Sequence, residues 1–185
     1  LDCSVAIIKN VNADAIIAVY PFTPQPSITQ AIISVSEVPV FVGVGGGMTN
    51  GDRSVRLAEY SEHQGASGVV VNAPISNETI AKMKAVVDIP VVTTIVSGDM
   101  DIAGRLAAGA DILNVSGASR TPEIVAKIRA EFPTVPIIAT GGPREEDILR
   151  TIEAGANAIT YTPPTTGQLF ADIMVSHRKN FSHQD

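Results

Sequence analysis

The 185-residue sequence lacks tryptophan, has few aromatic residues and contains one cysteine, Cys3. A single cysteine excludes an internal disulfide, and the shortage of aromatic residues means that aliphatic side chains must fill the core. Nineteen acidic residues outnumber 13 basic ones, and the net charge of −6 argues against a nucleic-acid surface. No apolar run reaches the length of a membrane span, and no secretory signal is visible. We therefore expect a cytoplasmic protein that binds neither nucleic acid nor a membrane.

Seven short apolar runs, rich in Val and Ile, recur along the chain. Their polarity does not alternate, which is typical of parallel strands buried on both faces. The runs are Ala15–Tyr20, Val40–Val44, Gly68–Asn72, Val91–Val96, Ile112–Ser116, Ile137–Thr140 and Ala158–Thr162. Amphipathic segments such as Glu145–Ala156 predict helices between the strands. Val5–Lys9 lies too close to the first run for a parallel crossover, so it also predicts a helix.

The residues at which these runs begin alternate between two kinds. One kind is alanine followed by a small or polar residue, as in Ala110–Asp111 and Ala156–Asn157. The other is an aliphatic residue followed by proline, as in Ile89–Pro90 and Val135–Pro136. Each kind recurs after about fifty residues, so two βα units form one repeat. The pattern predicts a single α/β domain over residues 1–185, a (βα)8 TIM barrel; an open doubly wound sheet is the alternative.

Seven strands leave one position of an eight-stranded barrel unfilled, between Ala15–Tyr20 and Ala158–Thr162. The barrel therefore lacks its first strand, which is expected before Leu1. The edges of the two flanking strands would expose unpaired backbone groups. We expect a partner chain or the N-terminal segment to cover them, and hence a homo-oligomer.

Binding sites of such barrels lie at the carboxyl ends of the strands. The polar and glycine residues at these ends define a candidate ligand pocket, which comprises Gly45, Gly46, Asn72, Asn114, Ser116 and Arg120. No strand ends in a lysine that could form a Schiff base, and no histidines have the spacing of metal ligands. Asp99 is the candidate catalytic carboxylate, with a helix cap as its alternative role. The sequence predicts neither a cofactor nor a metal.

Two glycines, Gly141 and Gly142, stand where a buried strand passes into a helix. They let a ligand approach backbone N–H groups, and the helix behind them adds partial positive charge. Thr162 and Thr165 can donate hydroxyl groups from the last loop. We therefore predict a phosphate-binding site, with a purely structural turn as the alternative. The run Gly43–Gly47 differs from the dinucleotide fingerprint, and it predicts either a flexible lid or a second phosphate loop.

The segments "ADILNVSGA", "PIIATGG" and "AGANAIT" resemble the phosphate-binding barrel superfamily. The last three units are most similar to the glycerol-uptake operon antiterminator family, which has a similar glycine-bearing strand end and a Ser/Thr-rich last strand. This resemblance implies a glycerol-phosphate-like ligand and RNA-linked regulation, with Gly141, Gly142 and Thr162 at the anion site. The same strands also resemble IMP dehydrogenase, but the catalytic cysteine loop of that enzyme has no counterpart here.

Two functions fit these features. The first is a barrel that binds a small phosphorylated metabolite with Arg120 as an anion clamp; if it is an enzyme, it is a cofactor-independent lyase, isomerase or hydrolase. The second is a non-catalytic, ligand-sensing regulator of the antiterminator type.

Overall fold

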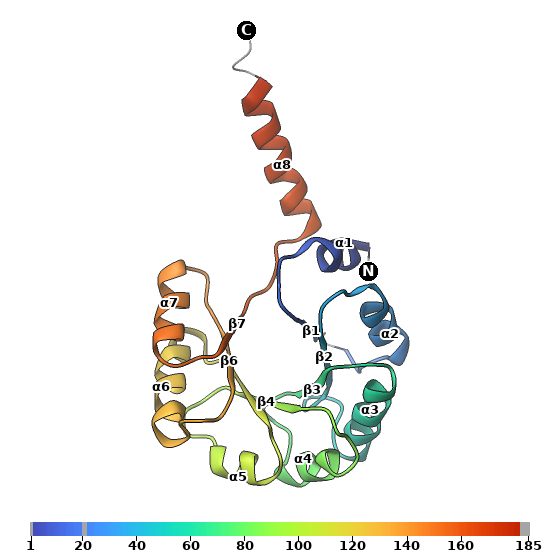
Figure 1. Ribbon diagram of the computed structural model, residues 1–185, viewed down its shortest axis with the longest axis vertical. Coiled ribbons are helices and arrows are strands. Elements are labelled where there is room, and N and C mark those ends of the chain that lie inside the picture. Colours follow the sequence, from blue (N-terminus) through green and yellow to red (C-terminus); the bar gives the residue numbers. More distant parts are fainter. Residues whose placement is uncertain (1, 20–21, 182–185) are drawn as a thin grey trace.

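The computed structural model describes residues 2–19 and 22–181, and within them seven parallel strands are each followed by a helix (Figure 1). The strands are β1 (Ile16–Ala18), β2 (Val40–Gly45), β3 (Gly68–Val71), β4 (Val91–Ile95), β5 (Ile112–Val115), β6 (Ile137–Thr140) and β7 (Ala158–Thr160). The helices are α1 (Asp2–Asn10), α2 (Pro26–Val35), α3 (Asp52–His63), α4 (Asn77–Lys84), α5 (Ile102–Ala107), α6 (Thr121–Glu131), α7 (Glu145–Glu153) and α8 (Thr166–Phe181). The seven predicted strands and the N-terminal helix are confirmed. Tyr20, which the prediction placed in the first strand, lies outside the described residues.

The strands pair in chain order into one curved sheet, β1 to β7. Among the described residues, β1 pairs with β2 alone and β7 with β6 alone, so the sheet does not close. The opening between β1 and β7 is the position of the missing barrel strand, as predicted. The architecture is therefore a TIM barrel with one strand position unfilled.

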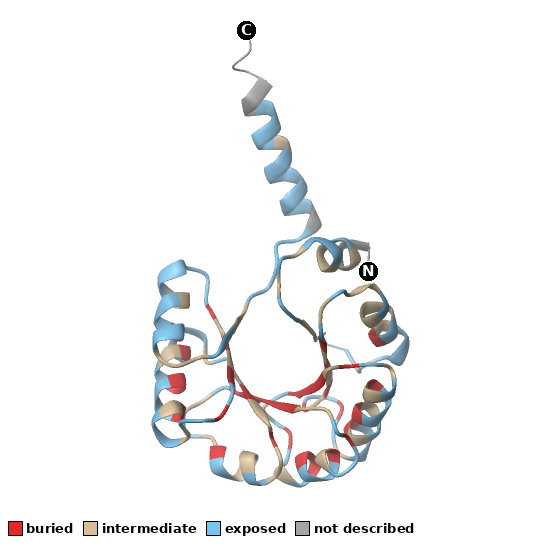
Figure 2. Cartoon of the chain, viewed as in Figure 1, coloured by how far each residue is buried: buried red, intermediate tan, exposed pale blue. Residues whose placement is uncertain are grey.

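Aliphatic side chains form most of the core. Figure 2 shows buried residues on the strands and on the surrounding helices. One cluster joins β2–β4 to α3 and α4 and includes Val42, Val69 and Ile80. A second cluster joins β5 and β6 to α6 and includes Leu113 and Ile137. The expectation that aliphatic rather than aromatic residues fill the core is confirmed.

Hydrogen bonds explain the two alternating kinds of strand start. The Asp111 carboxylate, at the start of β5, accepts the N–H of Val91 at 2.8 Å, and Val91 follows the proline that precedes β4. The Asn157 side chain, at the start of β7, accepts the N–H of Ile137 at 2.9 Å in the same way on β6. At these two strand starts the polar residue therefore satisfies the first amide of the preceding, proline-preceded strand.

The preceding helices extend this repeat with a basic side chain. Lys84 Nζ lies 2.9 Å from the Asp111 carboxylate, and Arg129 Nη2 donates to the Asn157 side chain at 2.8 Å. Two glycines make room for the aliphatic parts of these basic side chains. A Cβ at Gly109, where φ is +105°, would lie 2.8 Å from Lys84 Cγ, and a Cβ at Gly155, where φ is +107°, would lie 2.9 Å from Arg129 Cγ. Positive φ and this close approach together explain why both positions are glycine.

Replacing Arg129 by alanine is expected to lower the free energy of unfolding by about 2–3 kcal/mol. The Arg129 guanidinium donates to the carbonyl oxygens of Val135 and Gly155, each at 2.8 Å, and so ties the end of α6 to the starts of β6 and β7. Urea denaturation measures the loss. Arg56→Ala, at an exposed position of α3, is the control, and equal midpoints for the two variants would contradict the role assigned to Arg129.

Helix α8 leads away from the barrel (Figure 1). An exposed connection that contains Pro163 and Pro164 separates it from β7. Among the described elements α8 contacts α1, and most of its surface is exposed (Figure 2). Within residues 2–19 and 22–181, no helix combines the length and hydrophobicity that a membrane crossing needs.

Candidate functional site

Two cavities lie at the carboxyl ends of the strands, on different sides of the barrel. The Gly43 cavity has a volume of about 230 Å³, and the Gly142 cavity one of about 430 Å³. The Gly43 cavity is lined by Val19, Phe22, Thr23, Pro24, Gly43, Gly45, Gly47, Met48, Thr49, Val70 and Asn72. The Gly142 cavity is lined by Ala118, Ser119, Thr121, Pro122, Thr140, Gly141, Gly142, Pro143, Arg144, Asp147 and Thr151.

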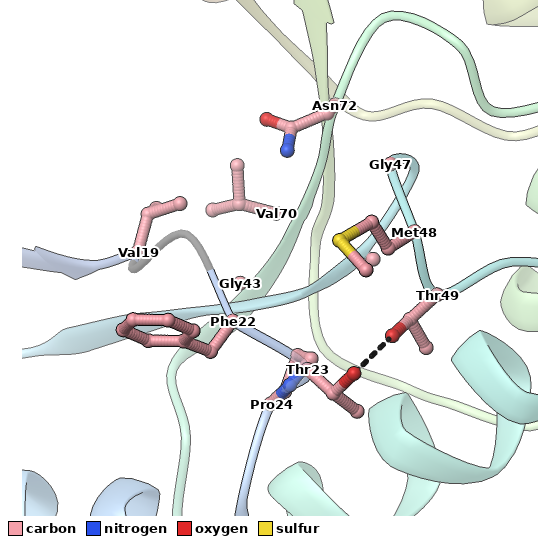
Figure 3. Close-up of a pocket in the computed structure, with 11 residues that line it drawn as sticks. Val19, Phe22, Thr23, Pro24, Gly43, Gly47, Met48, Thr49, Val70 and Asn72 are labelled. Carbon is pink, nitrogen blue, oxygen red and sulfur yellow. Dashed lines mark hydrogen bonds between the residues drawn. The ribbon is translucent and has the colours of Figure 1, made fainter.

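The Gly43 cavity exists because β2 carries glycine where other strands carry larger side chains. Gly43 pairs in register with Val70 of β3, and Asn72 follows β3 at the upper side of the cavity (Figure 3). The Thr23 and Thr49 hydroxyl groups, 3.3 Å apart, supply polar groups at its base. No charged side chain is among the described lining residues, so this cavity suits an uncharged group.

Within the glycine run that borders this cavity, Gly46 is required by the close approach of its loop to the end of β3. The Gly46 N–H donates to the Thr49 carbonyl, and the Asn72 N–H donates to the Gly45 carbonyl, both at 2.9 Å. A Cβ at Gly46, where φ is +95°, would lie 2.5 Å from the Asn72 nitrogen. Gly47 has no atom within 4 Å of the same position. Gly46 is therefore explained by packing, while Gly47 leaves the mouth of the cavity open.

The Gly142 cavity lies between the turn after β6 and the first turns of α6 and α7. The hydroxyl-bearing residues Ser119 and Thr140 line it together with Arg144. Arg120, the N-cap residue of α6, makes no side-chain hydrogen bond to that helix. The Thr121 hydroxyl is engaged locally, because it accepts the Gly117 N–H at 3.0 Å and donates to the Ala118 carbonyl at 2.9 Å.

The charged side chains among the described residues that line the Gly142 cavity are Arg144 and Asp147, and they form an ion pair. Arg144 Nε and Nη2 donate to the two carboxylate oxygens of Asp147 at 2.9 Å and 3.0 Å. The hydrogen bond from Arg144 holds the pKa of Asp147 below its ordinary value, and the same contact raises the pKa of Arg144. A guanidinium has five N–H donors, so these two bonds leave three donors for a ligand.

Both glycines of the turn also have structural reasons. A Cβ at Gly141 would lie 2.7 Å from Ile159 Cγ2 and 2.8 Å from Ile148 Cγ1, so the missing side chain lets α7 pack close to β7. Gly142 has φ +79°, which favours glycine in any tight turn. The purely structural alternative thus accounts for the two glycines without a ligand.

The first turn of α7 is acidic, with Glu145, Glu146 and Asp147. These side chains stabilise the positive end of α7 and oppose an anion placed directly on that helix. Sequence reasoning missed them, although "PREED" directly follows the glycine pair. An anion in this cavity would therefore have to be held mainly from the α6 side and by Arg144.

The structure separates the other predicted site residues. Asp99 is 92% exposed, with a carboxylate oxygen 3.7 Å from Lys127 Nζ on α6, and it lines neither cavity. Asn114 donates to the Thr94 hydroxyl at 3.4 Å on the inner side of the sheet. Gly45 and Asn72 line the Gly43 cavity, whereas Gly46, Asn114, Ser116 and Arg120 are absent from both described linings.

The two threonines predicted to bind phosphate lie in the exposed connection to α8, outside both linings. The Thr165 N–H and hydroxyl donate to Gln168 Oε1 at 2.8 Å and 2.9 Å, and the Gln168 N–H donates back to Thr165 Oγ1 at 3.3 Å. This is a capping arrangement at the start of α8, and the spacing T-x-x-Q was its visible signal. Among the residues predicted to bind phosphate, Gly141 and Gly142 line the Gly142 cavity, whereas Thr162 and Thr165 do not.

No protein-family model and no curated protein matches the sequence. Solved structures with the same fold include 2,3-dimethylmalate lyase, with a TM-score of 0.70 and 13% identity over 98% of this chain and 79% of that one. An aldolase has a TM-score of 0.68 and 16% identity, with 84% and 80% covered. Dihydrodipicolinate synthase from Aquifex aeolicus has a TM-score of 0.66 and 16% identity, with 85% of this chain covered.

These likenesses establish the barrel fold. This chain spans 61% of the length of the A. aeolicus enzyme. The similarity to the phosphate-binding superfamily and to the antiterminator family rests on the short sequence segments alone.

Proposed function

We propose that this chain binds a small phosphorylated metabolite in the Gly142 cavity. The observation that carries the proposal is the placement of this cavity at the carboxyl end of β6, between Arg144 and the start of α6. A volume of about 430 Å³ lies within the range of about 300–1,000 Å³ typical of small-molecule sites.

The groups around the cavity suit a phosphate. The three remaining Arg144 donors can bind phosphate oxygens, a contact for which a planar guanidinium is well shaped. Ser119 and Thr140 add hydroxyl groups. The positive end of α6 lies on the same side, and the acidic residue of its first turn is Glu123 alone, against three on α7.

A lyase is the second candidate function, and the names of the aldolase and the 2,3-dimethylmalate lyase that share this fold favour it. Among the described lining residues the cavity has no lysine or histidine, and Asp147 is its one carboxylate. Because the pKa of Asp147 is lowered by Arg144, this carboxylate is a weak base. The cavity is thus better equipped for binding than for proton transfer.

Phosphorus and carbon NMR on a panel of sugar phosphates incubated with the protein separate the candidates. A ligand that binds and stays intact supports binding alone, including the regulator alternative, while carbonyl-containing cleavage products support the lyase. The same assay on Asp99→Asn tests the catalytic role proposed for that carboxylate. A panel without measurable binding would contradict the proposed function.

Opposite effects are expected from the two halves of the ion pair. Arg144→Gln removes the guanidinium and should weaken binding of glycerol phosphate about tenfold. Asp147→Asn removes a like charge beside the anion and frees Arg144, so binding should strengthen about fivefold to tenfold. Calorimetry measures both affinities, with Glu131→Gln at the exposed end of α6 as the control. A pair with only a structural role would move both affinities in the same direction or leave both unchanged.

A further inference from the structure

Helix α8 carries an apolar face that its own barrel does not cover. Leu169, Phe170 and Ile173 are 38%, 66% and 64% exposed, and Met174 follows Phe170 by one turn. This spacing places the four side chains on one side of the helix. An isolated helix of 16 residues is marginal in water and depends on packing of such a face.

The barrel has one side that no described helix covers. The free edges of β1 and β7 face the opening, and α1 and α7 lie on either side of it (Figure 1). Helix α7 exposes two apolar side chains one turn apart, Leu149 at 52% and Ile152 at 48%. Unpaired strand edges promote association unless a helix or loop covers them.

The connection between β7 and α8 explains why the helix leaves its own barrel. Pro163 and Pro164 fix φ and restrict the residue before each of them to extended conformations. The two prolines therefore favour an extended connection after β7, in contrast to the tight Gly141–Gly142 turn after β6. The Thr165–Gln168 capping arrangement then starts α8 beyond this stiff segment.

We propose that two copies of this chain exchange α8, so that each helix lies over the opening of the other barrel, between α1 and α7. One chain has a helix whose apolar face is uncovered and a barrel side that no described helix covers, and a second copy can cover both at once. Such a reciprocal contact closes as a two-fold symmetric dimer. Each helix is about 24 Å long, and two of them would bury roughly 1,500 Å² or more, the size of a stable interface.

Light scattering after gel filtration tests the dimer, with the protein at tens of micromolar. We expect twice the chain mass of 19.3 kDa. Phe170→Glu places a charge in the contact and should raise the dissociation constant at least about thirtyfold. Val175→Glu replaces an exposed apolar residue on the other side of α8 and should leave the dimer intact. A monomeric unsubstituted protein, or equal effects of the two variants, would overturn the proposal.

Ile152→Glu on α7 distinguishes helix exchange from pairing of two α8 helices with each other. Exchange predicts that this variant also raises the dissociation constant of the dimer, and circular dichroism should show both variants folded. An Ile152→Glu protein that dimerises as tightly as the unsubstituted protein would rule out the exchange.

Discussion

Gly142→Asp is expected to weaken the binding of inorganic phosphate and of sugar phosphates about hundredfold or more. The new carboxylate would stand beside Asp147, since a Cβ at Gly142 lies 3.1 Å from Asp147 Cβ. It would fill space at the turn that borders the cavity and repel the anion. Repulsion between like charges at this range in a partly dry site is on the order of a few kcal/mol.

Gly142→Ala is the matched control for the backbone. Both variants must adopt φ +79°, which costs a non-glycine residue about 1 kcal/mol, but the alanine adds no charge. Calorimetry with phosphate and thermal melts of all three proteins separate the loss of affinity from the loss of stability. If the folded aspartate variant binds as well as the original protein, the turn is structural only, and the ligand should then be sought in the Gly43 cavity.

Gly46→Ala is expected to lower the free energy of unfolding by about 3 kcal/mol or more. The new Cβ would lie 2.5 Å and 2.6 Å from the backbone nitrogen and oxygen of Asn72, so the backbone itself must move. Overpacking costs about 1–3 kcal/mol, and the positive φ of +95° adds a further 1–2 kcal/mol.

Gly47→Ala belongs to the same loop and should be nearly neutral, because nothing lies within 4 Å of its Cβ position. Urea denaturation of both variants gives the comparison. Equal midpoints would mean that the loop adapts freely to a side chain and that its contact with β3 contributes little to stability.

The barrel was predictable because its parallel strands are buried on both faces and so appear as continuous apolar runs. The side chains of Asp111 and Asn157 accept the backbone N–H groups of Val91 and Ile137. These hydrogen bonds account for the polar residues at alternate strand starts, and that alternation made the repeat visible in the sequence. Boundaries were less certain at β1 and β7, where terminal runs such as Ala158–Thr162 extend past the last paired residue.

The site was only partly predictable, because the inner and outer sides of a doubly buried strand have similar composition. Asn114 lies on the inner side with Thr94, while Asp99 reaches Lys127 of α6, and sequence position alone does not distinguish the two directions. Thr165 caps helix α8 through its hydrogen bonds with Gln168. The prediction that it binds phosphate considered its place near the last strand and not this local T-x-x-Q motif. The Arg144–Asp147 pair was visible in the local sequence, but its position against Gly142 required the three-dimensional turn.

The unclosed sheet gives this molecule the connectivity of a linear array. In a closed barrel every strand has two neighbours, whereas within the described residues each strand pairs only with those next to it in the chain, and the series ends at β1 and β7. Stability in such an array is approximately a sum of nearest-neighbour terms. Local opening is therefore cheapest at the terminal strands and most costly around β4, so the barrel comes apart from the two rims of its opening inward.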